Sequence, residues 1–92
     1  MLTIQQIKRS AWARRFKAAC PDQYAEALLL AQNVGSVTID LRDDHSAKGD
    51  YVWAIIPETN AEFWLDGLPT LKEAVKVCTR MAWPIKNIWP RT

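Results

Sequence analysis

"VGSVTIDL", residues 34 to 41, is the stretch at which the periodicity of this sequence changes. Before Gly35 the apolar residues recur at the spacing of helices, and after it Val37, Ile39 and Leu41 alternate with polar residues. An alternating run of this kind predicts a half-buried strand. A chain that changes from helices to strands at one point is expected to have an α+β fold.

Two helices are predicted before the change. The first is expected over residues 4–19, because Thr3 and Gln6 have the spacing of a capping box and Pro21 interrupts the helical pattern. The second is expected over residues 21–34, with the proline in its first turn, where a missing backbone N–H costs nothing.

Three strands are predicted after the change, and they are expected to form a three-stranded antiparallel sheet. The first is the alternating run at 37–41. "YVWAIIP" (51–57) and "AEFWL" (61–65) are rich in β-prone residues and are separated by a short turn, which predicts a hairpin. Because both faces of 51–57 are apolar, this segment is expected to be the middle strand.

A last helix is predicted over residues 71–82. Thr70 and Glu73 have the spacing of a second capping box, and Pro84 ends the helical pattern. Residues 85–88 could add a short edge strand. The expected order is therefore α-α-β-β-β-α, with the helices covering one face of the sheet and residues 1–92 forming a single domain.

Composition narrows the class of protein. Hydrophobic residues make up 49% of the 92 residues, which is typical of a globular domain. No apolar run has the length of a signal peptide or a membrane span, so a cytoplasmic location is expected. Cys20 and Cys78 are the two cysteines, and in a reducing compartment both are expected to be free thiols.

Catalytic and metal-binding patterns are weak. His45 is the one histidine, and the chain has no glycine-rich phosphate loop. The polar loop around His45 could place carboxylates around a divalent cation, but it lacks the acidic spacing of a calcium-binding loop. A solvated loop is the preferred interpretation, so we expect a protein that is not an enzyme and needs no metal or cofactor. The acidic and histidine side chains of this region are Asp40, Asp43, Asp44, His45 and Asp50.

Charge is distributed unevenly along the chain. Residues 1–20 carry five bases and no acid, residues 21–70 carry nine acids and two bases, and residues 71–92 carry five bases and one acid. The net charge of +2 therefore hides two basic ends and an acidic middle. Basic clusters of this kind are typical of proteins that contact nucleic acids or acidic protein surfaces.

The basic cluster "KRSAWARRFK" (8–17) allows two interpretations. If one continuous helix spans it, Lys8 and Arg15 fall within the apolar arc, where their stems could lie along the core edge with the charge in water. Alternatively, the helix contacts phosphates or an acidic protein surface, together with cations of the last helix if the two helices pack side by side. The cations assigned to such a surface are Arg9, Arg14, Lys17, Lys72, Lys76 and Arg80, and Lys86 and Arg91 could contribute to it.

Five tryptophans are many for a chain of this length. Trp12 and Trp53 are expected in the core. Trp64, Trp83 and Trp89 lie where a core position is less assured, so they are candidate partner-binding anchors, since exposed tryptophans are frequent hot spots. The alternative for each of the three is that it caps an edge of the sheet.

One segment resembles a pattern found in other small proteins. "VWAIIPETNAEFWLDGLPTLKEAVKVC" (52–78) resembles a hairpin-plus-helix pattern of small phage and mobile-element proteins, with Thr70 as cap, the Glu73–Ala74 pair and then Cys78. Small size, many tryptophans and few enzymatic motifs also resemble phage-encoded inhibitors of bacterial defence, including anti-CRISPR proteins. This group has no shared motif, so the resemblance implies no residue roles.

The resemblance and the charge pattern lead to two expected functions. The first is a non-enzymatic inhibitor in the host cytoplasm that docks on a bacterial protein or nucleoprotein complex through its basic helix and exposed aromatics. The second is a small DNA- or RNA-binding regulator that uses the basic ends on phosphates. A helix-turn-helix is possible in residues 4–34, but the second helix, which would read the DNA, has no Lys or Arg.

Overall fold

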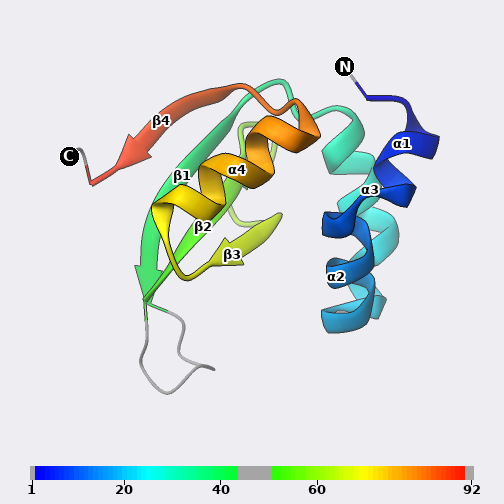
Figure 1. Ribbon diagram of the computed structural model, residues 1–92, viewed down its shortest axis with the longest axis horizontal. Coiled ribbons are helices and arrows are strands. Elements are labelled where there is room, and N and C mark those ends of the chain that lie inside the picture. The colour runs from blue at the N-terminus through cyan, green and yellow to red at the C-terminus, as the bar shows by residue number, and fades with distance from the viewer. Residues whose placement is uncertain (1, 44–50, 91–92) are drawn as a thin grey trace.

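The computed structural model describes residues 2–43 and 51–90 and shows an α+β fold (Figure 1). The helical first third and the strands after it confirm the change of periodicity near Gly35, whose φ of 65° lies in the left-handed region. The elements are α1 (Ile4–Arg9), α2 (Ala11–Ala19), a 3-10 turn η1 (Pro21–Gln23), α3 (Tyr24–Gln32), β1 (Val37–Asp43), β2 (Tyr51–Pro57), β3 (Asp66–Leu68), α4 (Leu71–Met81) and β4 (Ile85–Trp89).

The sheet has four strands in the order β3-β2-β1-β4, and it is mixed. β1, β2 and β3 pair antiparallel, as predicted, but β4 joins the outer edge of β1 in parallel, so the prediction of three antiparallel strands is wrong. The backbone N–H of Val37 donates to the carbonyl of Pro84 at 2.8 Å just before the two strands align. A parallel pair needs a long crossover connection. Here β2, β3 and α4 together form that connection.

The strand predicted at 61–65 is displaced, and β3 begins at Asp66. Asn60 bends the preceding segment into a turn, because its side-chain Oδ1 accepts from the N–H of Glu62 and its carbonyl accepts from the N–H of Phe63. The chain then rejoins β2 where the N–H of Leu65 donates to the carbonyl of Ile55 at 2.8 Å. A local side-chain hydrogen bond therefore competes with the sheet over 61–63.

The first predicted helix is two helices, because Ser10 separates α1 from α2. Its backbone is extended, with φ −69° and ψ 156°. Its Oγ donates to the carbonyl of Ile7 at 2.6 Å and accepts from the N–H of Ala13 at 3.1 Å. Ser10 thus closes one helix and caps the next, which is the behaviour that makes serine poor in helix interiors and good at caps.

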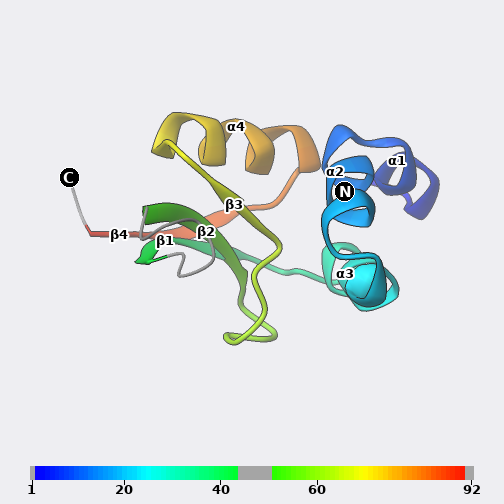
Figure 2. The same ribbon diagram turned by 90° about the horizontal axis from the view of Figure 1, so that it is seen from below.

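The helices pack in two places. α4 alone covers one face of the sheet, whereas α1, α2 and α3 stand together at one end of the strands (Figure 2), so the expectation that all helices cover one face is corrected. The core lies where the two groups meet. The Trp12 ring packs edge-on against Trp83 at a centroid distance of 5.3 Å, and the Trp12 Nε1 donates to the carbonyl of Leu65 at 2.6 Å. None of the described helices has the length and apolar composition of a membrane span.

Candidate functional site

The cations of α1 and α2 point in different directions. Arg9, Arg14 and Lys17 are all exposed, as predicted. However, the break at Ser10 separates Arg9 from the other two, and the Lys17 ammonium lies 5.7 Å from the ring centre of Tyr24, toward α3. These three residues therefore do not form one continuous stripe, and their role in binding stays a prediction.

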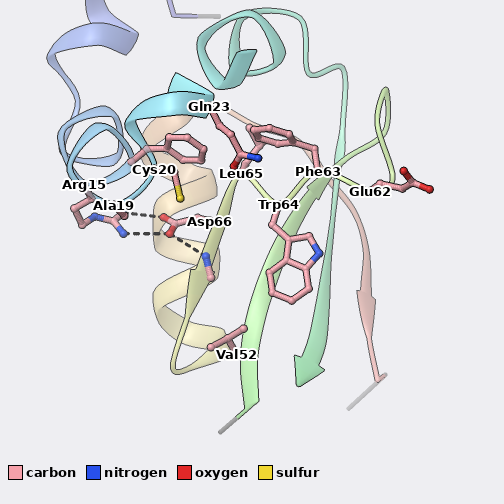
Figure 3. Close-up of a pocket in the computed structure, with 12 residues that line it drawn as sticks. Arg15, Ala19, Cys20, Gln23, Val52, Glu62, Phe63, Trp64, Leu65 and Asp66 are labelled. Carbon is pink, nitrogen blue, oxygen red and sulfur yellow. Dashed lines mark hydrogen bonds and ion pairs between the residues drawn. The ribbon is translucent and has the colours of Figure 1, made fainter. Parts of the chain in front are cut away.

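Arg15 is directed from α2 toward β3, where it pairs with Asp66 (Figure 3). Its two terminal nitrogens donate to the two carboxylate oxygens at 3.3 and 2.9 Å, and Oδ1 also accepts from the N–H of Gly67 at 2.9 Å. Burial raises the pKa of Asp66 despite the lowering effects of Arg15 and this backbone N–H. Lys8 and Arg15 are both exposed, and the break at Ser10 places them on separate helices. The interpretation that their stems lie along the core edge stays a prediction.

The cations of α4 form one stripe. Lys72, Lys76 and Arg80 recur every fourth residue and are exposed, while Ala74 and Cys78 on the opposite side are buried against the sheet. Within the described residues no carboxylate forms an ion pair with these three cations. The predicted exposed position of the stripe is confirmed, and its role as a binding surface stays a prediction.

α1, α2 and α4 lie toward the same side of the molecule (Figure 2). Together these three helices carry eight basic residues and Glu73 as their one acid, which is a formal charge of +7. The rest of the 92-residue chain therefore carries −5, since the net charge is +2. We call the exposed cations of α1, α2 and α4 the basic face.

A groove of about 300 Å³ separates α1 and α2 from the last turns of α4. Arg15 contributes to its wall from α2 and Arg80 from α4. Its other lining residues are mostly apolar. We call this cavity the α2–α4 groove; it is lined by Leu2, Gln6, Ser10, Ala11, Trp12, Arg15, Val77, Arg80 and Met81.

A larger open groove of about 720 Å³ lies on the opposite side of Arg15, between the end of α2 and the segment leading into β3 (Figure 3). Phe16 and Phe63 stack in its wall at a centroid distance of 6.0 Å. Figure 3 shows Trp64 directed along the sheet toward Val52, whereas Glu62 points away from the groove. The groove therefore has aromatic walls. The charged groups of its polar region, Arg15 and Asp66, are already paired with each other.

The two cysteines are free thiols in different surroundings. Cys20 is exposed and lines the larger groove. Cys78 lies on the buried side of α4, and burial together with the negative charge of Asp66 raises its pKa to about 12. A thiol with such a pKa stays protonated at neutral pH and is a poor nucleophile.

The tryptophans predicted as binding anchors have different positions. Trp83 is 4% exposed and its Nε1 donates to the carbonyl of Ala31 at 3.3 Å, so it is a core residue and is withdrawn from the candidate set. The neighbouring prolines favoured an exposed C-terminal segment, but the chain continues into β4 and this segment packs against the helices. Trp64 is half-buried beside the larger groove, and Trp89 on β4 is 44% exposed.

In residues 2–43 and 51–90, no three His, Cys, Asp or Glu side chains gather closely enough to hold a metal ion. Asp44, His45 and Asp50 of the predicted polar loop lie outside the described residues.

Arg15 and the α2–α4 groove were missed by reasoning from the sequence. A single continuous helix places Arg15 within the apolar arc, and that position does not predict a carboxylate partner. Its partner Asp66 is 51 residues away and no sequence pattern links the two. The serine at position 10 was the one available signal, because serine favours helix caps over helix interiors.

Comparison with protein-family models, with curated proteins and with solved structures finds no match to this chain. The resemblance of residues 52–78 to small phage proteins therefore stays a prediction.

Proposed function

We propose that this protein is a non-enzymatic binding protein that docks through its basic face on an acidic surface of a bacterial protein or nucleoprotein complex. Docking would inhibit the partner by occlusion, in the manner of the phage-encoded inhibitors of bacterial defence that the sequence resembles. The proposed location is the cytoplasm of the host cell, and the proposed activity needs no cofactor.

The observation that carries the proposal is the separation of charge. α1, α2 and α4 together hold a formal charge of +7, whereas the remaining residues of the chain hold −5. Single exposed ion pairs contribute only about 0.2–1 kcal/mol each. An excess of one sign of charge on neighbouring helices nevertheless steers an oppositely charged partner.

The stripe on α4 also favours the second candidate, a small DNA- or RNA-binding regulator. Lys72, Lys76 and Arg80 are not committed to described carboxylates and could contact phosphates. A helix-turn-helix is not supported, because the first predicted helix is split at Ser10 and α3 carries Glu26 with no Lys or Arg. This candidate would therefore use α4 on the nucleic-acid backbone without reading bases.

A capture experiment separates the two candidates. The tagged protein is incubated with bacterial lysate, with and without nuclease, and bound proteins are identified by mass spectrometry. The test variant is Lys72→Glu/Lys76→Glu/Arg80→Glu, and the control is Lys86→Glu on β4, outside the basic face. Thermal unfolding confirms that each variant is folded.

We expect a nuclease-resistant partner that binds the wild type and the Lys86→Glu control and is lost with the triple variant. Recovery of the same partner by the triple variant would show that the basic face is only a solvated surface. Loss of every partner after nuclease treatment would instead support the nucleic-acid-binding candidate.

A further inference from the structure

We infer that the α2–α4 groove holds one apolar side chain of an acidic peptide segment on the partner, with Arg15 and Arg80 contacting the carboxylates that flank it. This inference rests on the proposed function, because it names the chemistry that the basic face recognises. It also gives the interaction an anchor that charge alone does not provide.

The groove has an apolar lining that would gain from a partner. Leu2 and Val77 are only partly buried and Ala11 is exposed, whereas Trp12 and Met81 are already almost wholly buried, at 2% and 4% exposed. Removing apolar surface from water is the main favourable contribution to most protein association. With a volume of about 300 Å³, the groove is at the small end of ligand sites, which suits one anchoring side chain.

The walls of the groove determine the charge of the occupant. Arg15 and Arg80 lie on different helices, so they border the groove from two elements. Within the described residues Arg80 has no carboxylate partner, and its planar guanidinium is suited to binding one in a bidentate manner. Arg15 is about half exposed even while it pairs with Asp66, so its charge still contributes to the rim.

The same features argue against a nucleic acid as the occupant of this groove. A nucleotide base would need an exposed ring on which to stack, and Trp12 is 2% exposed. Arg15 and Arg80 could contact a phosphate, but the other lining side chains are aliphatic or small and polar and would contribute nothing to binding one. An acidic peptide with an apolar residue matches both the apolar lining and the two arginines.

Binding of fluorescent peptides measured by anisotropy tests the inference. One probe is the peptide Asp-Glu-Asp-Phe-Asp-Glu-Asp, and the second has Ser in place of Phe. Ala11→Trp places a large side chain in the groove without changing the charge. Ala18→Trp is the matched control, because Ala18 is also an exposed alanine of α2 but does not line the groove. Arg80→Glu reverses the charge of one wall, and a labelled DNA duplex is the third probe.

We expect the Phe peptide to bind the wild type about tenfold or more tightly than the Ser peptide, since burial of an aromatic side chain is worth at least that factor. Ala11→Trp should abolish this preference and Ala18→Trp should keep it, while Arg80→Glu should weaken both peptides several-fold. The comparison of the two peptides on the wild type needs no variant, so it remains decisive if Ala11→Trp fails to fold.

Other results would overturn the inference. Equal binding of the two peptides, both weakened by Arg80→Glu, would remove the anchoring groove but leave the basic face as a docking surface. Absence of binding by either peptide would contradict both the groove and the recognition of acidic segments. Tighter binding of the DNA duplex, unaffected by Ala11→Trp, would assign the basic face to nucleic acid.

Discussion

Arg15 ties α2 to the start of β3 by donating from both terminal nitrogens to the carboxylate of Asp66, at 3.3 and 2.9 Å. The Asp66 side chain is 13% exposed, and the pKa of its carboxyl is raised from its ordinary value of 3.8 because burial outweighs the attraction of Arg15. The folded protein thus holds this proton more tightly than the unfolded chain. The stabilising contribution of Asp66 is therefore present below pH 3.8 and is lost as the pH rises through the raised pKa.

Arg15→Ala should destabilise the protein by about 1–3 kcal/mol at pH 7, because a buried carboxylate would lose its charged partner. The loss should be smaller at pH 3, where Asp66 is protonated and needs no counter-charge. Urea unfolding followed by tryptophan fluorescence at the two pH values measures the difference. Arg14→Ala, which removes an exposed arginine with no ion pair among the described residues, should change stability by less than about 0.5 kcal/mol. Equal losses for Arg15→Ala at both pH values would contradict the electrostatic explanation.

Ser10→Ala should cost about 0.5–2 kcal/mol, because α2 would lose the hydroxyl that caps the N–H of Ala13. Ser10→Gly should cost only a few tenths, since glycine also tolerates the cap position. Hydrogen exchange of the Ala13 amide should become faster in the alanine variant. An unchanged exchange rate, or a rise in helix content that joins α1 to α2, would show that the hydroxyl does not maintain the break.

Ala82→Gly should stabilise the protein by about 0.5–1 kcal/mol. Ala82 ends α4 in the left-handed conformation, with φ 58° and ψ 37°, which is costly for a residue with a Cβ and free for glycine. Ala25→Gly is the control, because Ala25 is an exposed residue within α3, where glycine should cost about 0.5–1 kcal/mol. Thermal and urea unfolding measure both changes, and a loss of stability in Ala82→Gly would refute this explanation.

Iodoacetamide at pH 8 should label one thiol in the folded protein and two in urea. Cys20 is exposed, whereas Cys78 is buried and its pKa of about 12 keeps the thiol protonated. Mass spectrometry of the modified peptides identifies the reactive residue, and Cys20→Ser should abolish labelling of the folded protein. Rapid labelling of Cys78 without denaturant would show that α4 opens readily from the sheet.

Several elements could be predicted from the sequence because their determinants lie within a few residues of one another. Thr3 caps α1 through the reciprocal bonds of the capping box, and the Thr70 hydroxyl caps α4 by accepting from the N–H of Glu73. Two spacings likewise predict which side chains face outward. These are the alternation at 37–41 and the four-residue spacing of the α4 cations. The sequence therefore predicts most of the basic face, because the excess of basic residues in three helices can be counted directly.

The tertiary structure decided what depends on segments far apart in the chain. Trp83 is buried because β4 returns beside β1 and brings it against Trp12, and β4 is parallel because the connection crosses over the sheet. Arg15 has Asp66 as its partner, and Arg80 faces it across a groove, only because α2, β3 and α4 pack at one corner of the molecule. Hydrogen bonds within a turn are set by neighbouring residues. Burial, ion pairing and cavities are set by the most favourable packing of the whole chain, and no local pattern records them.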